Sequence, residues 1–233
     1  MEIFWRLLLA HLLTDFTFQT DFLARWKIKS AVGVLVHSLV FFVCAAALCL
    51  PEINDAWPIK EPYIVLRGWL VIAILSLLHF LEDGWRAHTI NKENSSDSFA
   101  FFLWDQLTHY FMLFVFTPAG GSLLPGKWVS LGILFVLATH FSAIVIYYIQ
   151  KGLPRAVPIL RNEKYYFILE RAAMLAALLL PGFWALTFPA VLLMRKAVKK
   201  VSFPSPFSAV NITASPLLAL AFGTLARFVF YTY

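Results

Sequence analysis

Histidine and aspartate side chains recur one helical turn apart in this sequence. Three such pairs occur: His11 with Asp15, His79 with Asp83, and Asp105 with His109. Residues four apart lie on the same face of a helix, so each pair presents an imidazole and a carboxylate together. These groups are ligands for zinc, iron and manganese. A divalent ion held by them can activate water for hydrolysis of an ester or a phosphate.

The sequence therefore predicts a divalent metal site, of zinc, iron or manganese, in a hydrolase that acts on a lipid-type substrate. The predicted ligands are His79, Asp83, Asp105, His109 and His37, with His11 and Asp15 as supporting residues. Carboxylates often orient a ligand imidazole by hydrogen bonding to it, so some of the Asp residues are expected to orient ligands.

The composition predicts that these residues lie inside a membrane. Hydrophobic residues make up 61% of the chain and charged residues only 14%, against roughly 45–50% and 25% in soluble domains. A soluble fold of this size cannot bury so much apolar surface. The net charge of +6 is concentrated in a few short segments, which does not indicate a nucleic-acid partner.

Apolar segments of about 20 residues match the roughly 30 Å hydrocarbon core of a bilayer. We expect an all-α, polytopic transmembrane helix bundle forming a single domain over residues 1–233. About eight membrane segments are predicted: 3–23, 31–50, 64–81, 99–118, 127–148, 165–181, 183–194 and 208–230. The seventh is short and can be re-entrant.

The distribution of Lys and Arg predicts the orientation in a bacterial inner membrane. Thirteen of the nineteen positive residues lie in four alternate loops, namely 24–30, 82–98, 149–164 and 195–207. Such loops face the cytoplasm, which places the amino terminus outside. The polar residues of the helices, with His79 and Asp83 at a helix end, then lie in the cytoplasmic half of the membrane.

Other charged residues receive structural interpretations. Glu170 and Arg171 are predicted to form a structural pair. The basic residues that are expected to contact anionic lipid headgroups are Arg195, Lys196, Lys199 and Lys200. The spacing of His11 and Asp15, repeated at His79 and Asp83, also suggests that hairpins 1–50 and 64–118 are duplicated.

Several of these motifs together resemble a known family. They are the segment Leu9-Ala-His-Leu-Leu-Thr-Asp-Phe16 with Gln19, then His37, His79 with Asp83, Asp105-Gln106-x-x-His109, and Glu170-Arg171. They are similar to the bacterial membrane family called domain of unknown function 3307, most strongly over residues 8–110. This sequence departs from the family at two positions. Thr14 stands where the family tends to have Gly, and Arg86 stands where Lys is expected. The resemblance implies an architecture and a set of site residues, but it implies no substrate. The sequence is also loosely similar to membrane-bound metal-dependent hydrolases.

Two alternative functions fit the same residues. Buried Asp–His and Glu–Arg pairs can simply satisfy one another as interhelical hydrogen bonds, in a structural or accessory subunit of a larger membrane complex. A proton or ion relay, or haem held by His37 and His140, is the third hypothesis. Metal content, copurifying subunits and an optical spectrum distinguish the three.

The charge distribution makes a direct prediction about topology. Single cysteines introduced at Ser96 and at Asn54 should react with a membrane-impermeant thiol reagent from opposite sides, because the 82–98 loop is predicted to be cytoplasmic. Cys44 and Cys49 are replaced first. Labelling of both positions from the same side would contradict the predicted orientation.

Overall fold

The computed structural model describes residues 1–60, 64–92, 97–118, 123–153, 161–202 and 208–232. It is all-α, as predicted, with about 85% helix and one small two-stranded sheet. The chain divides into two compact units, residues 1–129 and 130–233. That the two form a single domain, and that two hairpins are duplicated, stay predictions.

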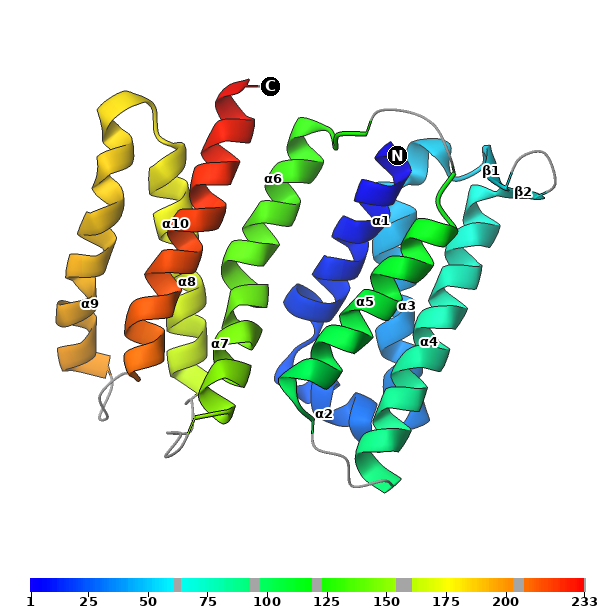
Figure 1. The fold of residues 1–233 in the computed structure, drawn as a ribbon, viewed down its shortest axis with the longest axis horizontal. Helices are drawn as coiled ribbons and strands as arrows, with labels where there is room; N and C mark the ends of the chain where they lie inside the picture. The colour runs from blue at the N-terminus through cyan, green and yellow to red at the C-terminus, as the bar shows by residue number, and fades with distance from the viewer. Residues whose placement is uncertain (61–63, 93–96, 119–122, 154–160, 203–207, 233) are drawn as a thin grey trace. The chain divides into compact units, whose positions relative to one another are not determined.

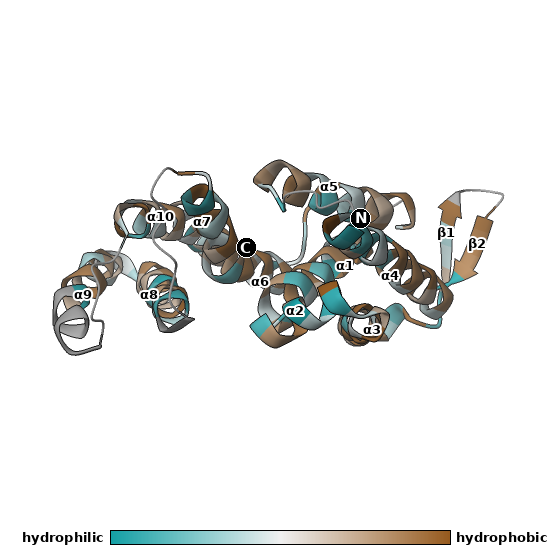
Figure 2. Ribbon diagram, turned by 90° about the horizontal axis from the view of Figure 1, so that it is seen from below, coloured by the Kyte–Doolittle hydropathy of each residue, from teal (hydrophilic) through white to brown (hydrophobic). Residues whose placement is uncertain are grey.

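The first unit contains four helices around a common core (Figures 1 and 2). They are α1 (Glu2–Leu12), α3 (Ala31–Leu48), α4 (Gly68–Lys92) and α5 (Phe99–Val115). Contacts join α1 to α3, α3 to α4, α4 to α5 and α5 back to α1, so each helix has one face toward the centre. Buried apolar side chains, including Leu7, Phe41, Ile72 and Leu113, fill one part of this centre.

The predicted segment 3–23 is wrong as a single helix. After α1 the chain forms a π-helical turn, η1 (Leu13–Phe18), and a new helix, α2 (Asp21–Lys29), begins after Thr20. The hydroxyl of Thr20 accepts a hydrogen bond from the Leu23 amide, and Ser30 caps α3 in the same way. Such caps satisfy amides that have no partner in the first helical turn. The predicted loop 24–30 is therefore mostly helix.

The segment predicted at 64–81 also differs. Residues 64–67 form strand β2 (Ile64–Arg67), which pairs antiparallel with β1 (Ala56–Lys60). The helix α4 begins only at Gly68 and continues for 25 residues, through the predicted 82–98 loop as far as Lys92. His79 and Asp83 thus lie well inside a helix and not at its end.

The second unit consists of helices alone within its described residues. A long helix comprises α6 (Lys127–Val136), the π-helical turn η3 (Leu137–Phe141) and α7 (Ser142–Lys151). Next come α8 (Arg161–Leu179), the 3₁₀ turn η4 (Gly182–Thr187), α9 (Phe188–Ser202) and α10 (Ala209–Thr232). The segment predicted at 183–194 is thus part 3₁₀ turn and part a longer helix, and α9 packs against α8.

Four helices of the described chain are long and apolar enough to cross a membrane: α3, α4, the continuous α6–α7 helix and α10. A count of about eight membrane segments stays a prediction. Large apolar side chains are exposed on these helices and on α5, among them Val43 and Phe111, which are 64% and 67% exposed. Exposed apolar surface of this kind suits contact with lipid.

The packing of α2 against α3 predicts an effect at Gly33. A Cβ atom at this position would lie 2.5 Å from the backbone carbon of Trp26, so Gly33→Ala should destabilise the protein by about 1–3 kcal/mol through overpacking. Gly84→Ala in α4 is the matched control. Apart from its chain neighbours and the backbone of its own helix, no described atom lies within 4 Å of a Cβ at this position, and Ala favours helix. Unfolding curves in detergent measure both, and equal stability of the two variants would contradict this packing.

Candidate metal centre

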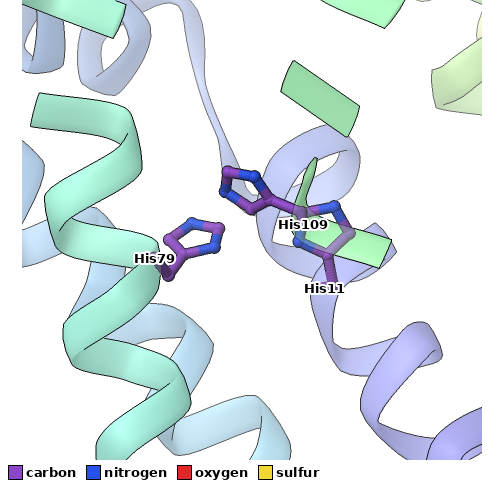
Figure 3. Close-up of side chains that lie close together, drawn as sticks. All are labelled: His11, His79 and His109. Atoms are coloured by element: carbon purple, nitrogen blue, oxygen red, sulfur yellow. The ribbon is translucent and has the colours of Figure 1, made fainter. Parts of the chain in front are cut away.

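Each helix of the first unit's core contributes one histidine to its centre. His11 comes from α1, His37 from α3, His79 from α4 and His109 from α5, and none is more than 3% exposed. Figure 3 shows the rings of His11, His79 and His109 pointing toward one another. Four segments distant in sequence therefore bring their imidazoles together.

Four buried carboxylates surround these rings: Asp15, Glu82, Asp83 and Asp105. Asp15 lies in the π-helical turn η1. Such turns shift the register of a helix and occur often at functional sites. Glu82 and Asp83 follow His79 by three and four residues on α4, so all three lie on one helical face.

Four ligand atoms form a closed group, here called the Asp–His group. The Nε2 atom of His37 lies 3.2 Å from Asp15 Oδ1 and 3.4 Å from Asp83 Oδ2. The Nε2 atom of His79 lies 3.6 Å from Asp15 Oδ1 and 3.3 Å from Asp83 Oδ2. Bonds of 2.0–2.2 Å in a tetrahedral zinc site give ligand separations of roughly 3.3–3.6 Å. These four separations lie in or close to that range, and the ligand atoms of Asp15, His37 and His79 all lie within 4.8 Å of one another.

The other oxygen of each carboxylate in this group is held from outside. Gln106 Nε2 donates a hydrogen bond to Asp15 Oδ2 at 3.1 Å, and Lys27 Nζ donates to Asp83 Oδ1 at 2.9 Å. Metal-binding carboxylates are commonly fixed by such secondary hydrogen bonds. The inward oxygens Asp15 Oδ1 and Asp83 Oδ2 are thereby oriented toward the two histidines.

Lys27 enters the cluster from the short helix α2. Burial alone would lower the pKa of this lysine, but the negative charges of Asp83, Asp15 and Asp105 outweigh burial and raise its pKa. Lys27 is therefore a permanent cation beside the Asp–His group. The charge pattern assigns Lys27 to a cytoplasmic loop, so the sequence does not predict its role in the cluster.

A second set of atoms, the three-His group, consists of ring nitrogens of His11, His79 and His109 that lie within 4.8 Å of one another. Their rings are close, with centroids 4.3 Å apart for His79 and His109 and 4.9 Å for His11 and His109. His79 thus belongs to both groups.

A third set joins Glu82, Asp105 and His109, whose ligand atoms also lie within 4.8 Å. Glu82 Oε2 lies 3.3 Å from His109 Nδ1. Arg86 donates to Asp105 Oδ2 at 2.9 Å and to the more exposed Asp97 at 3.0 Å. The sequence does not predict Glu82 and Arg86 as site residues, because Glu82 does not fit the four-residue spacing of the His–Asp pairs and Arg86 follows the expected end of the helix.

Many polar atoms of the cluster have no hydrogen-bond partner within the described residues. They include His11 Nδ1, His37 Nδ1, His79 Nε2, Glu82 Oε1 and Oε2, Asp83 Oδ2, Asp105 Oδ1 and His109 Nε2. Unsatisfied buried polar atoms are costly, at about 1–3 kcal/mol each. Their concentration in one place makes the cluster a candidate site for an ion or for water, either of which would satisfy them.

The buried charges fit a divalent cation. The carboxylates Asp15, Asp83 and Asp105 face two buried cations, Lys27 and Arg86, and Arg86 also pairs with Asp97. The cluster therefore has more carboxylates than cations, and a divalent ion would reduce this excess of negative charge. Burying a charge without such compensation costs several kcal/mol.

The charged residues of the second unit require a correction. Glu170 does not pair with Arg171 but accepts hydrogen bonds from Arg195 at 2.5 and 2.8 Å. Arg171 donates instead to Ser215 and to the Thr139 carbonyl. Adjacent residues on a helix do not face one another, which explains the error. Arg195 thus forms an ion pair with Glu170, and its contact with lipid headgroups stays a prediction. The side chains of Lys196, Lys199 and Lys200 lie outside the described residues.

The fold and the site define a class: helical proteins with membrane-length apolar segments and a buried cluster of histidines and carboxylates. The chain belongs to the family described as Protein of unknown function (DUF3307), which matches residues 3–127. The resemblance found in the sequence is thereby confirmed. Every residue of the cluster falls within the matched range. No curated protein and no solved structure matches the chain.

The ion pair between Lys27 and Asp83 predicts a large effect on stability. Asp83→Asn leaves Lys27 buried without its closest negative partner, so we expect a loss of about 3–5 kcal/mol, measured by unfolding in detergent with a chelator present. Asp97→Asn is the control, since the Asp97 side chain is 31% exposed and such pairs contribute about 0–1 kcal/mol.

The double variant Lys27→Met with Asp83→Asn tests the cause of that loss. It removes both charges together, so most of the lost stability should return. No recovery in the double variant would show that the Lys27–Asp83 pair is not the source of the effect.

Proposed function

We propose that this protein is a membrane-embedded, metal-dependent hydrolase whose substrate is a lipid-type ester or phosphate. The observation that carries the proposal is the Asp–His group, with four ligand atoms 3.2–3.6 Å apart along its four sides. Asp15, His37 and His79, whose ligand atoms all lie within 4.8 Å of one another, would hold the ion, with Asp83 Oδ2 beside the two histidines. Three protein ligands leave a coordination position open for water. Zinc, iron and manganese all accept such ligands.

A divalent ion bound there would supply Lewis acidity and lower the pKa of a water molecule into the neutral range. The chain's own residues prepare the site for it. Gln106 and Lys27 fix the two carboxylates from outside, which keeps the inward oxygens in place. Burial of the ligands excludes bulk water, and in such a medium electrostatic effects on a reacting group are strong.

The surroundings of the cluster support a substrate from the membrane. The cluster lies inside helices whose outer surfaces carry exposed apolar side chains, such as Leu39 on α3 and Leu107 on α5. A lipid can approach such surfaces from the bilayer without entering water. A bacterial inner membrane, about eight membrane segments and an external amino terminus belong to this proposal.

One observation favours the alternative of a non-catalytic accessory subunit. Lys27 and Arg86 already pair with two of the four carboxylates, Asp83 and Asp105, at 2.9 Å each. Ion pairs of this kind can serve helix association alone. A protein that purifies in fixed stoichiometry with other membrane subunits, and without metal, would support this alternative over the hydrolase.

Metal analysis of protein purified in detergent at neutral pH, without chelator, tests the proposal. The wild type should contain at least one equivalent of a divalent transition metal, and its hydrolysis of phospholipid in mixed micelles should stop when the metal is chelated. His79→Ala should remove the metal and the activity, because His79 lies in the Asp–His group. An optical spectrum of the same sample tests for haem.

His140→Ala is the matched control for that experiment. His140 lies in the second unit beside Thr139, outside the cluster, so this variant should keep both the metal and the activity. A metal-free wild type would contradict the hydrolase. Equal metal content in the wild type and in His79→Ala would contradict the assigned ligands.

A further inference from the structure

We propose that the second unit binds a small monovalent anion, such as chloride, at the buried guanidinium of Arg171. This site is separate from the metal centre, because it lies in residues 130–233, beyond the residues 3–127 that match the family. The observations that carry it are the burial of Arg171, the atoms that its side chain contacts and the charges of the unit around it.

Arg171 is a buried cation without a carboxylate partner among the described residues. It is 0% exposed and lies in α8, which packs against α10 and against the long α6–α7 helix (Figure 1). Its Nη1 donates to Ser215 Oγ at 3.0 Å, and its Nη2 donates to the Thr139 carbonyl at 2.7 Å. Both acceptors are neutral, and Nε has no hydrogen-bond partner in the described part of the chain.

The two acidic side chains of this unit have other partners. Residues 130–233 contain ten Lys and Arg residues but only two acidic residues, Glu163 and Glu170. Glu163 accepts a hydrogen bond from Asn211 at 3.1 Å, and Glu170 forms an ion pair with Arg195. One positive charge therefore remains at Arg171. Burial of an uncompensated charge costs several kcal/mol, and a bound anion would offset this cost.

Both helices that accept hydrogen bonds from Arg171 are interrupted at the point of contact. Thr139 lies in the π-helical turn η3, and Ser215 precedes Pro216, which lies inside α10 and has no backbone N–H for the helix. Such turns occur often at functional sites, and membrane proteins form ion sites where helices are interrupted. The position of Arg171 between two interruptions therefore favours a bound ion over helix packing alone.

Charge and depth indicate the class of anion. One negative charge balances one guanidinium, whereas a phosphate dianion would leave a buried excess. Arg171 lies ten residues after the start of α8 at Arg161 and eight residues before its end at Leu179, which is about 12–15 Å from either end at 1.5 Å per residue. A lipid headgroup stays at the membrane surface and does not reach this depth. A small free anion, with Arg171 Nε as its donor, fits both conditions.

The unfolding temperature of the full-length protein in detergent tests this site. Tryptophan fluorescence follows unfolding in sodium gluconate, whose anion is too large for the site, while chloride replaces gluconate stepwise at constant ionic strength. EDTA in every sample keeps metal in the first unit from influencing the result. A ligand that binds only the folded protein stabilises it, so the unfolding temperature of the wild type should rise by a few degrees and then saturate.

Three variants locate the ion. Arg171→Gln removes the charge and should abolish the dependence on chloride. Ser215→Ala keeps the charge but removes an acceptor that orients the guanidinium, so the chloride concentration for half of the effect should rise at least about threefold. Arg227→Gln is the matched control, because Arg227 donates only to backbone carbonyls of the same unit in its printed contacts, those of Leu178 and Leu180. This control should respond to chloride as the wild type does.

The outcomes decide between this site and its alternatives. A wild type with the same unfolding temperature in chloride and in gluconate overturns the anion site. An equal rise in the wild type and in Arg171→Gln overturns the assignment to Arg171. A larger rise with sodium phosphate than with chloride overturns the monovalent ion as the ligand. Size-exclusion elution checks that each variant is folded, and if Arg171→Gln does not fold, an unchanged response of Ser215→Ala overturns the site. None of these results depends on bound metal, so the hydrolase and the anion site are tested separately.

Discussion

The cost of burying charge in an apolar interior is the constraint on which the first unit depends. An unpaired ion away from water costs several kcal/mol, and the centre of this unit contains four carboxylates. Lys27 and Arg86 each lie 2.9 Å from one of them. The short helix α2 is needed to bring Lys27 there, and Gly33 allows the backbone of α3 to approach α2 closely. The position of α2, its packing against α3 and the ion pair between Lys27 and Asp83 therefore depend on one another.

The amide of Gln106 connects the ionic and the neutral parts of the cluster. It donates to Asp15 and Asp105 and accepts from His11, so one side chain fixes two carboxylates and one imidazole tautomer. Networks of this kind are worth more than their separate bonds. Replacement of this residue would therefore disturb several ligands of the cluster at once.

Sequence patterns predict the all-α fold and most of the cluster, but not its cations. A spacing of four residues is a local signal, and it identifies His79 and Asp83 as a pair on one helical face. Lys27 gives no such signal, because its position depends on the break at Thr20 and on the docking of α2. Glu82 is missed because it does not fit the four-residue His–Asp spacing, and Arg86 because hydropathy falls near residue 82, although the helix continues to Lys92. The hairpin of β1 and β2 is missed because its strands are short and β2 adjoins a long apolar segment.

In the second unit, proximity in sequence is misleading, since the ion-pair partner of Glu170 is Arg195, 25 residues away.

Stability alone does not explain the polar face of α4. His79, Glu82, Asp83 and Arg86 follow a helical spacing that places them on one side of the helix, toward the other three helices. Well-packed apolar residues at such positions often give equal or greater stability than buried ion pairs. The ion pairs also leave both oxygens of Glu82 and one nitrogen of His79 without a hydrogen-bond partner in the described chain. Helix association alone does not require these atoms to be unsatisfied, and a bound ion or water molecule would satisfy them.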